Sequence, residues 1–500
     1  MPYLAELEKA GIPTVVIDFS DQVEVVKQEA LENGIPNIRS VHASRTVPGP
    51  ADADTIVRPI LEALTRPLTE KEKESGIYNP AKPRVLFEGT LDEAETFYQQ
   101  TQDVPYPLNA PISVYTDGLP VRIPTEERVR EMLTGTSHKP DELVTYQTDR
   151  SGEIVGEKIV GERKKGMPVR FPPTNMTATV EKVAINAVMA GCKPEHLPVI
   201  LAMAESGCPT GTTTFHGQWV CLSGPIVKEL KMNCGYGMLD PGSPVNMPIG
   251  RAYQLLGINL GGAIPGVTRM NAIGNPFNSG GTCFAENADG LPPGWKGLNE
   301  EYGFKKNESV IMCMNGLFGI QGRQFSPGGY RAFQKSGHGG IARRLDVKGK
   351  PGPHNWLEYI VPRLWANQEG GWTFLMVPEM ARHLYDYGFK SKEAVYEWLW
   401  KKSFTTVKEY RNYSWTDLRT NGWMGIERTS GKPWKELPDD YLVPAAGDDP
   451  SNFLIIIGGG EEEVCLELGG RLSRAVSTDT EFRGGGGTIV DPVFSIDVWR

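Results

Sequence analysis

The sequence predicts an α/β protein, and the order of elements at its front is the first observation behind this prediction. A short helical pattern is followed by the apolar, β-branched run IPTVVI at residues 12–17. A second helical pattern covers 21–33, and an extended segment covers 35–42. A continuous apolar run is typical of a strand buried in a parallel sheet, so the α-β-α-β order predicts parallel pairing.

The second observation is that helical patterns and short buried strands alternate again in the rest of the chain. Helical spacing is clearest at 178–206, where Thr179 and Gly191 are typical of a helix start and a helix end. Strand-like runs stand at 218–222 and 453–457. We therefore expect a small parallel α/β half-domain followed by a large multilayer α/β domain.

Shorter elements are predicted between these segments from propensity and capping signals. They are a strand at 84–88, helices at 92–101 and 126–133, a hairpin-like stretch at 153–165, a helix at 247–259 capped by Asn246, and a helix at 392–402 capped by Ser391. Residues 1–70 are expected to form a partial flavodoxin-like half-domain, 71–110 a linker, and 111–500 the large α/β domain with the candidate site. A doubly wound domain normally opens with a strand, so the helix-first front reads as the second half of such a domain.

Composition and charge exclude several classes of function. Apolar residues make up 39% and charged residues 23% of the chain, as in an ordinary globular protein. A net charge of −9 argues against binding to nucleic acid or anionic membranes. No secretory signal is visible at the start, and none of the seven cysteines forms a CxxC pair, which favours reduced thiols in the cytoplasm.

The candidate site is the stretch 207–262, which is rich in glycine, threonine and cysteine. Cys208 follows a helix end in a loop of glycine and proline, where a thiol of lowered pKa could be reactive. The alternative is that Cys208 is a buried small hydrophobic residue. His216 comes shortly after Thr213 and Thr214, whose hydroxyls make its surroundings polar. It could serve as a general acid or base, or equally as a structural histidine.

A glycine-rich loop at 233–242 carries Cys234 and leads to the helix at 247–259. The free N–H groups at a helix start form an anion site, and an arginine adds a forked donor. Asn246, Gly250 and Arg251 are therefore expected to hold a small anionic substrate. The alternative is an exposed arginine beside a glycine that allows close packing.

A third cluster consists of Cys283, Glu286 and Asn287 at an expected strand end. Glu286 could be an acid, a base or a metal ligand, and the spacing does not decide among these roles. Metal ligation at long range is left open, because no short-range zinc spacing is present. No GxGxxG follows a strand in this region, so a dinucleotide is not indicated, and no cofactor is assigned.

Four further residues carry side chains that could take part in a site. Cys192 and His196 lie near the turn of a helical hairpin and are expected to be structural. Arg331 and His338 belong to the glycine-rich segment 324–343, which could be a lid or a phosphate-facing loop, or simply a surface loop.

The front segments EKAGIPTVVIDF and GIPNIRSVHASR resemble the back half of the small domain of UGSC-type proteins. That family is named for a selenocysteine-or-cysteine-Gly-Ser-Cys motif, and its small domain is similar to the selenoprotein B component of glycine and betaine reductases. The segments VEKVAINAVMAGCKPEHLPVILA, PGSPVNMPIGRAYQLLGINLGG, CFAEN and FLIIIGGG, in this order, resemble the family's large domain. The motif itself is not in this sequence, and the glycine turn is followed by Glu461, Glu462 and Glu463, which disfavour an anion there.

The resemblance implies a thiol- or selenol-assisted redox or bond-cleaving enzyme. It also implies a small partner subunit that carries the reactive cysteine or selenocysteine, although the front half-domain could equally be a docking or dimerisation element. We expect an oligomer, with a thiol from Cys208, Cys234 or Cys283 and proton transfer by His216. The alternatives are a lyase or hydratase that uses Glu286 and His216, with or without a metal, and a non-catalytic large subunit.

Overall fold

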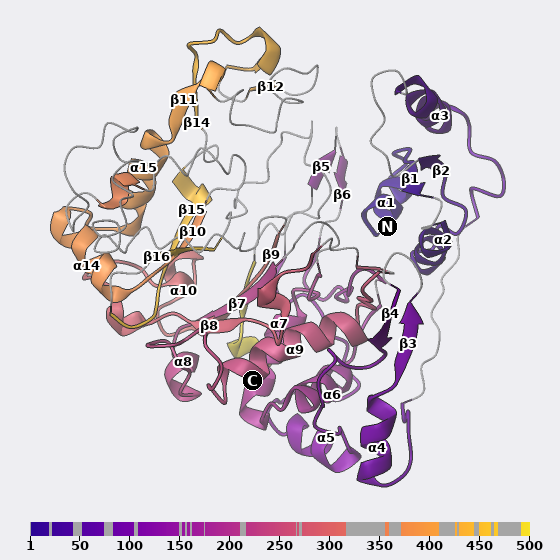
Figure 1. Ribbon diagram of the computed structural model, residues 1–500, viewed down its shortest axis with the longest axis horizontal. Coiled ribbons are helices and arrows are strands. Elements are labelled where there is room, and N and C mark those ends of the chain that lie inside the picture. Colours follow the sequence, from indigo (N-terminus) through magenta and orange to yellow (C-terminus); the bar gives the residue numbers. More distant parts are fainter. Residues whose placement is uncertain are drawn as a thin grey trace. The chain divides into compact units, whose positions relative to one another are not determined.

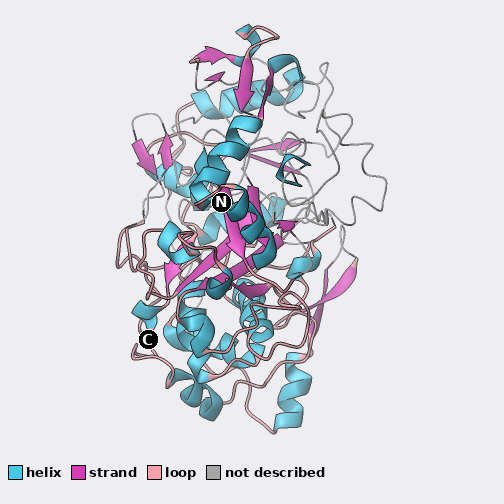
Figure 2. Cartoon of the chain, turned by 90° about the vertical axis from the view of Figure 1, so that its left-hand side faces the viewer, coloured by secondary structure: helices cyan, strands magenta, loops and turns pink. Residues whose placement is uncertain are grey.

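The computed structural model of the chain divides into two compact units. The first unit comprises Met1–Thr214 with Ala252–Ala272, and the second comprises Phe215–Arg251 with Ile273–Arg500. The structure describes residues 2–19, 23–43, 53–74, 84–104, 109–149, 153–155, 158–160, 163–174, 176–210, 217–266, 268–269, 273–316, 356–359, 372–409, 426–427, 430–444, 450–461, 465–468 and 492–500. Both units combine helices with sheets (Figure 1; Figure 2), so the α/β fold class is confirmed.

The front of the first unit is the parallel α/β arrangement that the sequence predicts (Figure 1). Its elements are α1 (Pro2–Lys9), β1 (Val16–Phe19), α2 (Val23–Glu32), β2 (Ser40–Ala43) and α3 (Ala53–Thr65). The strands β1 and β2 pair in parallel, with Asp18 opposite His42. The strand β1 begins later than predicted. Ile12 still belongs to the turn that ends α1, where its N–H donates to the carbonyl of Leu7 at 2.9 Å, and pairing with β2 starts only at Val16.

The rest of the first unit is largely helical. Its elements are α4 (Leu91–Tyr98), β3 (Thr101–Val104), β4 (Ala110–Ser113), α5 (Glu126–Leu133), β5 (Glu153–Val155), β6 (Lys158–Val160), α6 (Val180–Ala190), η2 (Pro194–His196) and α7 (Leu197–Ala204). The predicted strand at 84–88 is wrong: these residues have no partner strand among the described residues, and Val85 and Leu86 are exposed. The hairpin at 153–165 is confirmed, since β5 and β6 pair antiparallel.

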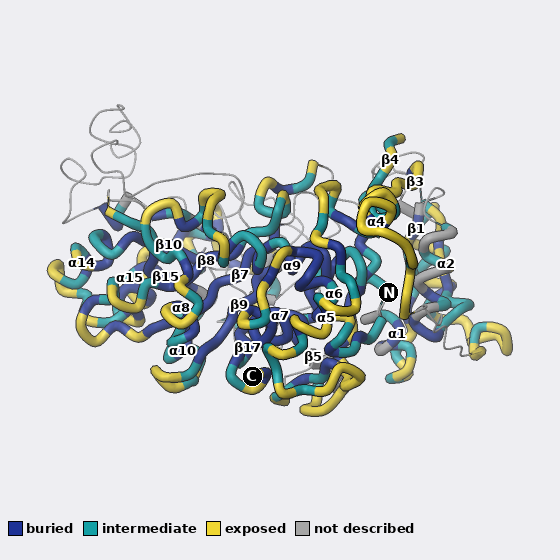
Figure 3. The backbone as a smooth tube through the Cα atoms, turned by 90° about the horizontal axis from the view of Figure 1, so that it is seen from below, coloured by how far each residue is buried: buried dark blue, intermediate teal, exposed yellow. Residues whose placement is uncertain are grey.

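The helical hairpin of α6 and α7 is buried along most of its length (Figure 3). The Thr179 side chain accepts a hydrogen bond from the N–H of Lys182 at 3.4 Å, and Gly191 ends α6 at φ 86°. Both predicted signals are confirmed.

Because this cap satisfies one of the free N–H groups at the start of α6, we expect Thr179→Ala to lower the free energy of unfolding by about 1 kcal/mol. Thr179→Ser keeps the accepting oxygen and is the matched control. Urea denaturation followed by circular dichroism measures both variants, and equal loss in the two would contradict the capping role.

The second unit contains two sheets. The first has the strand order β17-β9-β7-β8 and the second the order β15-β10-β16. The main elements are β7 (Gly217–Ser223), α8 (Ile226–Glu229), α9 (Asn246–Asn259, which ends in the first unit), η3 (Pro276–Asn278), β8 (Cys283–Ala285), η4 (Ala288–Gly290), α10 (Leu298–Glu301), β9 (Val310–Gly316), β10 (Trp372–Met376), α14 (Pro378–Tyr387), α15 (Lys392–Lys402), β15 (Phe453–Ile457), β16 (Cys465–Glu467) and β17 (Val493–Ser495).

Smaller elements complete the second unit. They are η5 (Trp356–Tyr359), β11 (Phe404–Thr406), β12 (Ile426–Glu427), β13 (Lys432–Pro433), η6 (Trp434–Glu436), β14 (Leu442–Pro444), η7 (Pro450–Asn452) and η8 (Asp497–Trp499). The strands β7 and β10 are buried along their whole length, and β7 pairs in parallel with β8, as β10 does with β15.

Alternating side chains of β10 and β15 fill two cores. Leu375, Leu454 and Ile456 pack in one cluster with Trp219 of β7 and residues of β9. The side chains between them on the two strands pack with α14 and α15 in a second cluster. This period of two explains why the run at 453–457 is apolar throughout and why the run at 372–376 is apolar except for the buried Thr373. Among the described helices, none is both long and apolar enough to span a bilayer.

Candidate functional site

The carboxyl ends of several strands meet in the second unit. The backbone N–H of Asn287, just after β8, donates to the carbonyl of Ile457, the last residue of β15, at 2.7 Å. Ile457 is also opposite Met376, the last residue of β10, and Ala285 of β8 lies opposite Leu222 of β7. Open α/β sheets bind ligands at the carboxyl ends of their strands, so this edge is a candidate binding site.

The loop at 233–238 is held at this edge by the side chain of Asn246. The Asn246 amide donates to the carbonyl of Asn233 at 2.8 Å and accepts from the N–H of Asn233 at 3.1 Å. Its oxygen also accepts from the Ser243 hydroxyl at 2.9 Å. The N–H of Gly459, in the turn after β15, donates to the carbonyl of Cys234 at 2.9 Å. Cys234, Gly459 and Asn287 therefore belong to one cluster of strand-end loops.

Asn246 does not cap α9 in the predicted way. It lies in the first turn of the helix and is buried, and its backbone N–H donates to the Ser243 hydroxyl at 3.1 Å. Ser243 therefore caps the helix, and the Asn246 side chain is bound to the loop. The predicted grip of Asn246 on a substrate has no support in these contacts.

The glycine turn after β15 packs tightly against the same loop. A Cβ atom on Gly460 would lie 2.2 Å from the Tyr236 ring, and one on Gly458 would lie 2.9 Å from the Met238 side chain. Because glycine has no side chain, the backbone of this turn can pack directly against the 233–238 loop.

Cys234 differs from the other cysteines in its exposure. All seven cysteines are described, none forms a disulfide, and Cys234 is the one that is not buried. Partial burial raises the pKa of the Cys234 thiol, and nearby Asp289 adds to the shift, while Lys228 acts against it. Lys228 and Asp289 form an exposed ion pair at 2.8 Å. The resting thiol is therefore protonated near neutral pH.

Cys208 and Cys283 are buried. Cys208, in the first unit, has a positive φ of 43°, and its thiol donates to the carbonyl of Met203 at 3.5 Å. Cys283 lies in β8 next to the close approach of Gly250, where a Cβ atom would be 3.0 Å from the Cys283 nitrogen. These surroundings favour the structural alternatives for Cys208 and Gly250, and Arg251 is half-buried beside Gly250.

Glu286 is fully committed to a buried polar network. It accepts hydrogen bonds from the Ser223 hydroxyl at 2.8 Å and the backbone N–H of Leu298 at 2.7 Å. Lys392, at the start of α15, lies 3.4 Å from Glu286 and 2.6 Å from Glu301. The Tyr396 hydroxyl donates to Glu301 at 2.9 Å and accepts from the N–H of Ile455.

Lys392 is completely buried and carries a charge between these two carboxylates. Burial by itself lowers the pKa of the Lys392 ammonium, but Glu301 and Glu286 more than offset this, so its pKa lies above the ordinary value. A carboxylate bound to a cation, a hydroxyl and an N–H has little capacity left for proton transfer. Glu286 thus links β8 to α10 and α15, and no local pattern in the sequence indicates this lysine 106 positions away.

The remaining predicted residues are not part of the contacts described above. Thr213, Thr214 and His216 lie outside the described residues, as do Arg331 and His338. Cys192 and His196 are buried in the helical hairpin, as the structural prediction expects. Burial lowers the pKa of the His196 imidazole.

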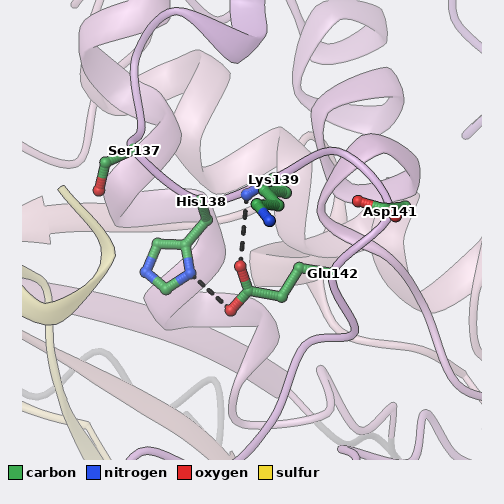
Figure 4. Close-up of a pocket in the computed structure, with 5 residues that line it drawn as sticks. All are labelled: Ser137, His138, Lys139, Asp141 and Glu142. Atoms are coloured by element: carbon green, nitrogen blue, oxygen red, sulfur yellow. Dashed lines mark hydrogen bonds and ion pairs between the residues drawn. The ribbon is translucent and has the colours of Figure 1, made fainter.

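A small open hollow in the first unit was not predicted from the sequence (Figure 4). It is lined by Ser137, His138, Lys139, Asp141 and Glu142. The His138 Nδ1 lies 2.8 Å from the Glu142 carboxylate, which also accepts from the N–H of Lys139 at 3.3 Å. These bonds are local and close a turn, so the pair fixes the loop. The H-x-x-x-E spacing was the available signal.

Within the described residues, no group of three or more His, Cys, Asp or Glu side chains could hold a metal ion. Comparison with known proteins adds no relative: no family model, no curated protein and no solved structure matches the sequence.

Proposed function

We propose that this chain is the large subunit of a thiol-dependent, oxidoreductase-like enzyme that acts on a small polar or anionic substrate, with Cys234 as its reactive sulfur. The observation that carries the proposal is the position of Cys234. It is the one cysteine that is not buried, and it lies where the loops after β8 and β15 meet. Of the three candidate thiols, Cys234 alone is open to a substrate or partner.

The second sulfur or selenium would come from a smaller partner subunit, as the resemblance to UGSC-type proteins implies. Both groups have to stay reduced between turnovers, which suits the cytoplasm. The resting thiol form of Cys234 agrees with this arrangement, because a raised pKa protects the sulfur from unwanted oxidation until a partner binds.

Two thiols can supply a two-electron reduction that balances. The carbon–heteroatom bond of the substrate breaks, and the carbon receives two electrons and one proton. The heteroatom leaves with the second proton. Cys234 and the partner thiol lose these electrons and protons and become joined by a disulfide, which an external dithiol reduces again.

The lyase or hydratase alternative receives less support, because Glu286 is held by Ser223, Leu298 and Lys392 inside the core. A non-catalytic large subunit is the other alternative. In that case Cys234 would be exposed without taking part in turnover.

The test is alkylation of the intact chain with iodoacetamide, read by mass spectrometry at all seven cysteines. We expect Cys234 to be modified first, more slowly than free cysteine near pH 7, and faster as the pH rises, because its pKa is raised.

A panel of small carboxylates, amino acids and phosphate esters is then screened, with 2-mercaptoethanol in place of the partner thiol. A substrate protects Cys234 from alkylation and converts it to the mixed disulfide.

Cys234→Ser should abolish this conversion, and Cys465→Ala, at a buried cysteine of the same unit, should leave it intact. If a product forms at the same rate in Cys234→Ser, the proposed role of Cys234 is wrong. If Cys234 reacts with iodoacetamide but no compound of the panel changes it, the non-catalytic alternative holds.

A further inference from the structure

The front half-domain contains a carboxylate and an imidazole in contact, a pair of groups suited to proton transfer. Asp18 of β1 and His42 of β2 are opposite each other in the parallel register, and the Asp18 carboxylate is in hydrogen-bond contact with Nδ1 of His42. Asp18 is 1% exposed and the His42 side chain is 61% exposed. Each residue is the last but one of its strand, so the pair lies at the carboxyl ends of β1 and β2.

Stability alone gives no reason for this arrangement. Burying a carboxylate costs solvation energy, and a partner that stays exposed to water returns little of it. A small apolar residue at position 18 would serve the sheet better, as Val16 does two positions earlier on the same strand. A buried acid that points an imidazole toward solvent at a strand end is instead a recurring feature of catalytic sites.

The pairing fixes which nitrogen can act as a base. An ionised carboxylate only accepts hydrogen bonds, so the proton of the neutral imidazole lies on Nδ1. The lone pair is then on Nε2, and Asp18 stabilises the imidazolium that forms when Nε2 takes up a proton. Asp18 is the one polar partner of His42 among the described residues, so Nε2 is not occupied by them.

We propose that Asp18 and His42 form a proton-transfer dyad that deprotonates a thiol brought to the carboxyl ends of β1 and β2. The S–H bond breaks, Nε2 takes the proton, and a thiolate remains. A thiol is the fitting class because a free thiol, with a pKa of about 8.5, gives up its proton far more readily than an alcohol does. This dyad is in the first unit, and its activity does not depend on the role proposed for Cys234 in the second.

The test uses the full chain with Cys234→Ser, so that the chain's own partly exposed thiol is silent. A small thiol, 2-mercaptoethanol, and a short peptide with a single cysteine are each reacted with a chromogenic aromatic disulfide at about pH 6.5, where free thiols are almost fully protonated. We expect the protein to raise the rate for at least one thiol on the order of tenfold or more. Acceleration of only the peptide identifies a partner cysteine, and acceleration of only the small thiol identifies a metabolite.

His42→Gln and Asp18→Asn should each remove the acceleration. His138→Gln is the matched control, because His138 is also paired with a carboxylate but lies in a loop away from any strand end. Since Asp18→Asn alters a buried group, the wild-type chain is also examined by NMR with 15N-labelled histidine. The neutral imidazole of His42, identified by its loss in His42→Gln, should carry its proton on Nδ1. No acceleration by the parent protein, an equal rate in His42→Gln, or a proton on Nε2 would overturn the proposal.

Discussion

Lys392→Met is expected to destabilise the second unit by about 3–5 kcal/mol, because it leaves two buried carboxylates without their cation. Glu286 and Glu301 are almost completely buried, and Lys392 is 0% exposed between them. Methionine fills a similar volume, so loss of packing contributes little. The shift of the urea midpoint, followed by tryptophan fluorescence, measures the effect.

Lys401→Met is the matched control on the same helix. Lys401 forms an ion pair with Glu397 at 3.4 Å, and both side chains are more than half exposed, so this substitution should change stability by less than about 0.5 kcal/mol. The raised pKa of Lys392 also determines how stability changes with pH. The charged lysine adds to the free energy of unfolding below the pKa of a free lysine, and this stabilisation is lost as the pH rises through the higher pKa that Lys392 has in the folded protein. Equal effects of the two substitutions would contradict the buried network.

Among the described glycines of the second unit, Gly281 is the one where exchange for alanine should be most damaging. A Cβ atom there would lie 1.9 Å from the carbonyl oxygen of Gly250, and the residue has a φ of 72°. The backbone of α9 cannot move away without displacing the start of β8. We expect a loss of about 3 kcal/mol or more, or failure to accumulate as folded protein.

The neighbouring Gly280 separates crowding from backbone strain. It has a φ of 76° but no atom within 4 Å of an added Cβ, so Gly280→Ala should cost only the left-handed conformation, about 1 kcal/mol. Thermal unfolding of the two variants, compared side by side, isolates the close approach. A Gly281→Ala protein as stable as Gly280→Ala would show that the two segments can separate.

Local signals in the sequence predicted local structure well. Thr179 and Ser391 each accept the capping hydrogen bond expected of them. The buried strand at 453–457 was predicted with its bounds, because a short apolar run between turn residues has few other solutions. The α-β-α-β order likewise predicted the parallel pairing of β1 and β2.

The failures have long-range causes. Asn246 carries a capping residue type, but Ser243 caps the helix, and Asn246 instead holds a loop that begins 13 positions earlier. The 84–88 segment has strand propensity, but no strand in the described part of the chain pairs with it. In both cases the outcome depends on a partner that residue type and spacing cannot name.

The sequence by itself determined the α/β class, the caps at Thr179 and Ser391 and the buried strand at 453–457, because these follow from periodicity, capping and turn chemistry within about twenty residues. Only the tertiary structure decided which polar groups are available for chemistry. It placed Glu286 against Lys392, buried six of the seven cysteines but not Cys234, and joined Asp18 to His42. Burial and pairing depend on contacts between residues far apart in the chain, and such contacts decide whether a carboxylate, a thiol or an imidazole is structural or free to react.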